Sequence, residues 1–200
     1  MLLVPSKYRV ARRLGAGIFD QTQTQKFALN EADKVKRRGR PPSDYGKQLL
    51  EKQRVRFTYG LSEKQLSRYA EAAFEEPNPS ESLHQALETR LDMFAHKAGL
   101  TQTRRSARQA ASHGHFLVNG TKVKVPSYRV KIGDVVTVRD GARKSPLYAT
   151  LAEKNPEGRA IANWIETDLG LMTAKMKALP SYTPGETGLD YATVFEFYSR

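Results

Sequence analysis

The chain has no cysteine among its 200 residues and only one tryptophan. The lack of cysteine excludes disulfides, zinc sites built from thiolates and cysteine nucleophiles. The sequence also lacks an apolar run long enough to span a bilayer, and the opening residues 1–5 are too short for the core of a signal peptide. We therefore expect a soluble, intracellular protein.

Acidic residues are outnumbered, with 21 Asp and Glu against 33 Lys and Arg and a formal net charge of +12. The positive charge is concentrated in residues 1–56 and 82–144, whereas residues 57–81 and 145–200 are net acidic. Cationic surfaces attract polyanions because counterions are released from phosphates when lysine and arginine replace them. Two separate basic blocks therefore predict a nucleic-acid binder that is more than a basic tail.

The first forty residues are basic and are expected to have little core of their own. Arg12 and Arg13 form one cluster, and Arg37 and Arg38 belong to a second. The interleaved aromatic residues are suited to stacking on bases. We interpret residues 1–40 as an extended basic arm, and the alternative is a disordered solubilising tail.

Two helices are expected after Pro42. Ser43 or Asp44 can cap a helix over residues 45–58, whose cationic side carries Lys47, Lys52 and Arg54. Ser62, with Gln65 three residues later, starts a second helix. The break at residues 75–79 is rich in proline and is the best candidate for a domain boundary.

Residues 80–140 predict a compact unit of two helices and a small antiparallel sheet. One helix runs from Ser80 to Gly99, and Thr103 caps another that reaches about His113. Asn119-Gly120 is a strong hairpin signal, and strands are expected on both sides of it and at 128–130 and 135–138.

The second of these helices carries cations on one side, and the hairpin adds two more. Arg104, Arg105 and Arg108 lie within about one turn, with Ser112 continuing the line, and Lys122 and Lys124 follow in the hairpin. Such a rigid patch suits the shape and phosphates of folded RNA. The alternative is an ordinary solvated helix face, which is disfavoured because Arg104 and Arg108 have few acids near them in the sequence.

The remaining residues give weaker signals. A short helix is expected near residues 148–154 and a strand at residues 164–168, while the aromatic C-terminus is too apolar for a free tail. Asp92 is better explained by capping or ion pairing than by catalysis. His113 and His115 lack a third ligand, so contact with backbone or phosphate is favoured over metal binding.

Several motifs resemble a known family. Residues 81–140 resemble the S-four-type RNA-binding domain through Arg90-Leu91-Asp92, Gly99-Leu100, Thr103-Arg104, Ala107-Arg108, Ser112-His113-Gly114-His115, Val118-Asn119-Gly120, Pro126-Ser127-Tyr128 and Gly133-Asp134. The flanking segments resemble the bacterial small-subunit ribosomal protein S-four family through Ser43-Asp44-Tyr45-Gly46-Lys47-Gln48-Leu49, Glu51-Lys52-Gln53, Tyr59-Gly60, Arg68-Tyr69, Trp164–Asp168 and the terminal Phe195–Arg200.

The resemblance implies an α+β fold. A helical domain of residues 41–80 plus 170–200 would hold an inserted RNA-binding domain with its extension, residues 81–169, after the basic arm of residues 1–40. The aromatic C-terminus would return to pack on the first helices. Many relatives carry four zinc-binding cysteines in the arm, and because this chain has none, no metal and no cofactor are expected.

The resemblance also implies a function. The family binds the five-prime domain of 16S-type ribosomal RNA early, nucleates assembly of the subunit body and affects translational accuracy in the cytoplasmic ribosome. Its implied partners are the neighbouring proteins S-five and S-three and messenger RNA near the channel through which it enters, with no membrane and no homo-oligomer. The predicted RNA-binding residues are Arg12, Arg13, Arg37, Arg38, Lys47, Lys52, Arg54, Arg90, Thr103, Arg104, Arg105, Arg108, Ser112, His113, Asn119, Lys122 and Lys124.

Two other functions compete with this one. An RNA-modifying enzyme, such as a pseudouridine synthase, would need a separate catalytic domain, for which few residues remain. A free RNA chaperone or translational regulator would use the same cationic surface without residing on the ribosome.

Overall fold

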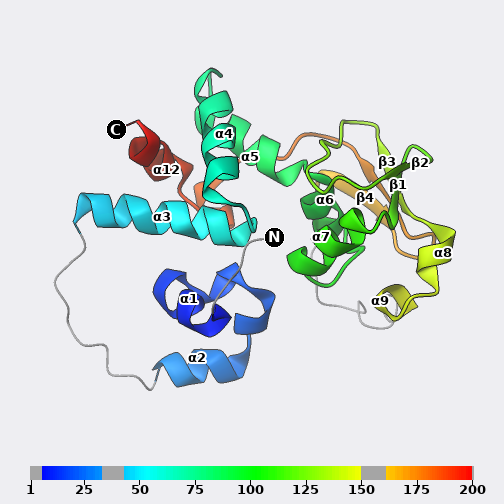
Figure 1. Ribbon diagram of the computed structural model, residues 1–200, viewed down its shortest axis with the longest axis horizontal. Coiled ribbons are helices and arrows are strands. Elements are labelled where there is room, and N and C mark those ends of the chain that lie inside the picture. The colour runs from blue at the N-terminus through cyan, green and yellow to red at the C-terminus, as the bar shows by residue number, and fades with distance from the viewer. Residues whose placement is uncertain (1–5, 33–42, 150–160, 200) are drawn as a thin grey trace. The chain divides into compact units, whose positions relative to one another are not determined.

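The computed structural model describes residues 6–32, 43–149 and 161–199. The chain forms two compact units, residues 1–83 with 182–200 and residues 84–181. Their elements are shown in Figure 1.

The described part of the first unit is helical. Its elements are α1 (Lys7–Leu14), the 3-10 turns η1 (Ala16–Ile18) and η2 (Asp20–Thr22), α2 (Gln25–Ala32), α3 (Asp44–Thr58), α4 (Glu63–Phe74), the start of α5 (Pro79–Glu88), α11 (Pro184–Thr187) and α12 (Tyr191–Tyr198). The predicted starts of α3 and α4 are confirmed. The Ser43 hydroxyl accepts a hydrogen bond from the Gly46 amide, and Ser62 and Gln65 form a reciprocal capping box.

The C-terminal helix packs on the first long helices, as expected. Helix α12 lies against α3 and α4 (Figure 1). The Tyr59 and Tyr191 hydroxyls are 3.0 Å apart in the buried interior. The Phe74 and Phe195 rings meet edge to face with 4.6 Å between their centroids. The aromatic C-terminus therefore supplies core to this unit.

The N-terminal segment differs from an extended arm. Residues 7–32 fold into α1, two 3-10 turns and α2, and Ala11, Leu14, Ile18 and Phe27 are buried. Ser6 caps α1, and the two buried side chains of this helix, Ala11 and Leu14, are three residues apart, which is the spacing of a helix face. The high content of cations in this segment masks this apolar stripe in the sequence.

The second unit is α+β. It contains α6 (Leu91–Lys97), α7 (Arg104–Ser112), β1 (Phe116–Val118), β2 (Thr121–Val123), β3 (Val135–Val138), α8 (Asp140–Arg143), α9 (Pro146–Ala149), β4 (Ile165–Asp168) and β5 (Thr173–Met176). The five strands are antiparallel in the order β2-β1-β3-β5-β4. Helices α6 and α7 pack on the sheet through one hydrophobic core that contains Phe94, Ala110 and Phe116 (Figure 1).

The helix predicted from Ser80 to Gly99 is two helices. Helix α5 ends at Glu88, and Arg90 has extended backbone angles before α6 begins at Leu91. At this break Arg90 forms an isolated antiparallel bridge with Arg129, and the Leu91 amide donates to the Tyr128 carbonyl at 2.8 Å. The segment 128–130, which was expected to be a sheet strand, therefore pairs with the helix break.

Strand β5 was not predicted from the sequence. Its presence shifts the expected boundary between the second unit and the C-terminal part of the helical domain. It pairs with both β3 and β4, so residues 170–181 belong to the second unit and not to the helical domain. The predicted strand at 164–168 is present as β4, while the short helix expected at 148–154 lies at 146–149, with residues 150–160 outside the described part. No described helix has the length and apolarity needed to cross a membrane.

Candidate nucleic-acid interface

Helix α7 has a clear buried side and a clear outer side. The Thr103 hydroxyl accepts a hydrogen bond from the Ser106 amide at 3.1 Å, and the Ser106 hydroxyl accepts one from the Thr103 amide. Thr103 is therefore the N-cap of the helix. Ala107, Ala110 and Ala111 are buried against the core. The cationic side chains occupy the remaining, outward positions of the helix.

The three arginines of α7 differ in exposure. Arg105 is exposed, whereas Arg104 and Arg108 are half-buried. The Nε of Arg104 is buried without a hydrogen-bond partner in the described part of the chain. The Nε of Arg108 lies 3.9 Å from Oδ2 of Asp92, so Arg108 has an acid beside it although few acids were expected near it. The sequence hid this contact because Asp92 lies on the preceding helix.

The hairpin places two lysines beside the end of α7. Asn119 and Gly120 both have positive φ, 49° and 80°, as the predicted turn requires. A Cβ added to Gly114 would lie 2.5 Å from Cε of Lys122 and 3.1 Å from Cγ of Lys124. The aliphatic stems of both lysines therefore cross closely over the residue that ends α7. Gly114 is needed for this close approach, and sequence reasoning had assigned it only to ending the helix.

These residues form one surface, which we call the helix–hairpin surface. It comprises Arg104, Arg105, Arg108, Ser112, His113, Lys122 and Lys124. Asn119 belongs to its support, because its side chain donates to Asp134 at 2.8 Å and accepts from the Val135 amide at 2.9 Å. The Ser112 hydroxyl is exposed and donates to the Arg108 carbonyl.

The two histidines lie at the edge of this surface. Their ring centroids are 5.9 Å apart, and Nδ1 of His115 is 3.3 Å from the Tyr148 hydroxyl. Burial lowers the pKa of His115 from its usual value of 6.5, and the nearby His113, Arg139 and Lys122 lower it further. No group of three metal-ligating side chains occurs among the described residues. His115 therefore lies in a partly buried environment with Arg139 and Lys122 nearby.

Arg90 is the predicted RNA contact that the structure places inside the protein. Its side chain is 2% exposed, and its Nε and a terminal nitrogen bind both oxygens of Asp92 at 3.0 and 2.7 Å. A guanidinium held in this way has no face available to RNA. Arg90 therefore neutralises the buried carboxylate of Asp92 at the start of α6.

Lys52 and Lys47 on α3, both predicted to contact RNA, differ in their exposure. Lys52 is buried, with Nζ 2.7 Å from Oε1 of Glu63 and 4.0 Å from the centroid of the Phe197 ring. Lys47, by contrast, is exposed and pairs only with the exposed Asp44, at 3.0 Å. Lys52 therefore joins α3 to α4 and α12, and its burial keeps it from a surface role.

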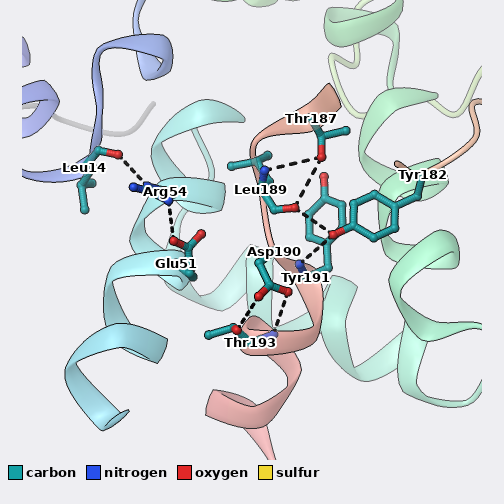
Figure 2. Close-up of polar contacts among 9 residues, drawn as sticks. All are labelled: Leu14, Glu51, Arg54, Tyr182, Thr187, Leu189, Asp190, Tyr191 and Thr193. Carbon is teal, nitrogen blue, oxygen red and sulfur yellow. Dashed lines mark hydrogen bonds and ion pairs between the residues drawn. The ribbon is translucent and has the colours of Figure 1, made fainter. Parts of the chain in front are cut away.

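Arg54 links the N-terminal helices to α3. Figure 2 shows its Nε donating to the Leu14 carbonyl at the end of α1, a distance of 2.6 Å, while a terminal nitrogen pairs with Glu51. Burial raises the pKa of Glu51, and the nearby Arg54 opposes this shift. The same view shows Asp190 capping α12 through Thr193 and the Tyr182 hydroxyl bonded to the Leu189 carbonyl. Arg54 therefore connects the end of α1 to α3.

The N-terminal cations divide into two groups. Arg12 and Arg13 are exposed in the last turn of α1. Arg37 and Arg38 lie outside the described residues. Among the described candidates of the first unit, Arg12 and Arg13 are exposed, Lys47 has 61% of its side chain exposed and Arg54 has 38%.

Comparisons with known proteins identify the family of this chain. The S4 domain family matches residues 89–136, and the family described as ribosomal protein S4/S9 N-terminal domain matches residues 4–89. Three similar curated proteins, each called small ribosomal subunit protein uS4, come from Persephonella marina, Mycobacterium ulcerans and a Roseiflexus species, with 41%, 38% and 36% identity respectively. Each alignment covers 96% of this chain and 95–96% of the relative. The chain belongs to the uS4 family of small ribosomal subunit proteins.

Proposed function

We propose that this protein binds small-subunit ribosomal RNA directly through the helix–hairpin surface. The observation that carries the proposal is that α7 bears three arginines and ends beside Lys122 and Lys124, whose stems cross over Gly114. Fixed cations at this spacing suit the phosphates of a folded RNA and need little ordering when they bind. Membership of the uS4 family supports the same partner.

The protein is a structural component of the small ribosomal subunit and not an enzyme, since that is the character of the uS4 family. The finer assignments are proposals that rest on the resemblance. They are binding to the five-prime domain of the RNA, nucleation of the subunit body, contacts with proteins S-five and S-three, and proximity to incoming messenger RNA. We also propose that the ribosome concerned is the cytoplasmic one.

Sedimentation tests residence on the ribosome. Cell extract would be run through a sucrose gradient at moderate salt under conditions that separate the subunits. We expect nearly all of the protein to sediment with the small subunit. A protein that stays mainly in the light fractions at the same salt would favour the alternative, a free RNA chaperone or translational regulator.

A matched variant tests the surface in the same gradient. Lys122→Ala combined with Lys124→Ala removes two exposed charges without removing buried groups. Lys175→Ala combined with Lys177→Ala removes two exposed charges from the β5 side of the same unit and serves as the control. We expect only the first pair to reduce the small-subunit fraction. Equal behaviour of both pairs would contradict the assignment of the surface.

A further inference from the structure

The segment between β2 and β3 exposes three large hydrophobic side chains to solvent. We call residues 125–132 the Val125–Ile132 loop. Val125 is 54% exposed, Tyr128 36% and Ile132 57%. Within the described part of the chain, the Tyr128 ring contacts no other aromatic ring and its hydroxyl has no hydrogen-bond partner.

The loop is held in place by its backbone. Its Pro126 and Tyr128 carbonyls accept from the Asp92 and Leu91 amides, at 3.1 and 2.8 Å, and the Val130 amide donates to the Thr89 carbonyl at 2.9 Å. These bonds fix the loop to the start of α6. The Tyr128 side chain is therefore displayed from an ordered support, which lowers the entropy lost when a ligand covers it.

The loop adjoins the helix–hairpin surface. It is bonded to the backbone of Asp92, whose carboxylate lies 3.9 Å from Arg108 on α7. Its N-terminal end directly follows Lys124, and Lys122 and Lys124 cross over Gly114 at the end of α7. The N-terminal end of the loop therefore adjoins residues that are proposed to bind RNA.

The loop and the strand β2 that precedes it carry only positive charges. Residues 121–133 contain four cations and no acid, and all four cations, Lys122, Lys124, Arg129 and Lys131, are exposed. Asp134, the next acid along the chain, bonds the Asn119 side chain and the Lys131 amide. An exposed aromatic ring within a cationic segment suits single-stranded nucleic acid, because the bases stack while the phosphates pair with the cations.

We propose that the Val125–Ile132 loop binds an unpaired segment of the ribosomal RNA, with one base stacked on Tyr128 and phosphates held by Arg129 and Lys131. The proposal rests on the proposed function and deepens it. An unpaired segment is required because bases within a duplex are already stacked on their neighbours. Charge complementarity favours RNA over an apolar protein surface as the ligand.

A pair of substitutions separates stacking from charge. Tyr128→Leu removes the aromatic face and keeps an apolar side chain, and Tyr128→Phe keeps the face and removes the hydroxyl. Affinity would be measured for the full chain with a transcript of the five-prime domain of small-subunit ribosomal RNA. We expect Tyr128→Leu to weaken binding roughly 5- to 150-fold, the range of one base stacked on an aromatic ring, and Tyr128→Phe to stay within about twofold.

The salt dependence gives a second, independent readout. Tyr128→Leu should leave the slope of log affinity against log salt unchanged, since stacking releases no counterions. Arg129→Ala combined with Lys131→Ala should reduce it by about 0.7 for each lost contact to a single strand. Leu171→Ala is the control, because Leu171 is an exposed apolar residue between β4 and β5, beside the opposite edge of the sheet from β2. This control should bind like the wild type.

The outcomes distinguish the two proposals. Failure of the wild-type protein to bind the transcript overturns the proposed function itself. Wild-type binding with an unaffected Tyr128→Leu variant overturns only the loop assignment, as does an equal loss in Tyr128→Phe. If Tyr128→Leu does not fold, the tyrosine ring protons of the wild-type chain supply the test by NMR. An upfield shift of Tyr128 on adding RNA supports stacking, and no shift overturns it.

Discussion

Arg90 and Asp92 form a bidentate ion pair in the interior of the second unit, with each side chain 2% exposed. The Oδ1 of Asp92 also accepts from the Met93 amide at 3.0 Å, at the start of α6. The Oδ2 lies 3.9 Å from Nε of Arg108 on α7. One carboxylate therefore connects the buried core with the helix–hairpin surface.

Asp92→Asn should strongly destabilise the second unit. The substitution leaves Arg90 charged and buried without its counterion, and breaking such a pair typically costs about 3–5 kcal/mol. Urea unfolding would measure the change in the free energy of unfolding. Asp140→Asn, which removes the exposed partner of Arg143, is the control and should have little effect. Similar stabilities for the two variants would contradict the assigned role of Asp92.

Asp92→Asn should also weaken RNA binding at a temperature where the variant stays folded. Removal of a negative charge near Arg108 would, by charge alone, strengthen binding to phosphate. We expect the opposite, because Arg108 loses the carboxylate that fixes its position. Tighter binding in a filter assay would show that Asp92 does not position the surface.

Lys52→Met should destabilise the first unit without changing RNA binding. The substitution retains an apolar stem but removes the ammonium group, which bonds Glu63 and lies over the Phe197 ring, and a hydrogen bond to a charged group contributes about 1.5–3 kcal/mol. Thermal unfolding and the salt dependence of RNA affinity would both be measured. Lys47→Met is the exposed control, and it should leave stability nearly unchanged. A lower salt slope for Lys52→Met would contradict its structural role.

Removal of residues 194–200 should destabilise the first unit by several kcal/mol. Val194 and Phe195 are buried, and truncation of one buried phenylalanine alone costs about 3–5 kcal/mol. Circular dichroism during heating would follow the change. Unfolding at the wild-type temperature would mean that α12 does not support this unit.

RNA should raise the pKa of His115. In the free protein burial and nearby cations lower this pKa below 6.5, so the unfolded chain takes up a proton that the folded chain does not. Stability therefore falls as the pH drops from 6.5 through the lowered pKa. Bound phosphates would offset the effect of Lys122 and Arg139 and move the pKa upward. NMR titration of the imidazole, assigned with His115→Gln, would detect this, and an unchanged pKa in the complex would count against RNA close to His115.

Local signals predicted much of the fold. Ser43, Ser62 and Thr103 cap helices where their hydroxyls precede helical patterns, and Asn119-Gly120 turns the predicted hairpin. The predicted α+β class and the ribosomal family are confirmed. These features depend on residues that are close in sequence, which explains why the sequence alone could reveal them.

Long-range contacts limited the prediction of the site. Arg90 and Lys52 resemble surface cations in the sequence, and only the fold shows that both are buried, where they pair with Asp92 and Glu63 respectively. Strand β5 was missed although it follows β4 after only a short connection, and its pairing with β3 spans a long one. The approach of Lys122 to Gly114 likewise depends on how the hairpin lies over α7.

The salt dependence of binding to the five-prime-domain transcript is the most direct test of whether the helix–hairpin surface binds RNA. Affinity would be measured across a range of salt concentrations for the wild type, for Arg104→Ala with Arg108→Ala, and for Lys122→Ala with Lys124→Ala. The account predicts weaker binding and a log–log slope that is lower by about 0.7–0.9 for each lost phosphate contact, with folding retained. Wild-type affinity and slope in both double variants would contradict it.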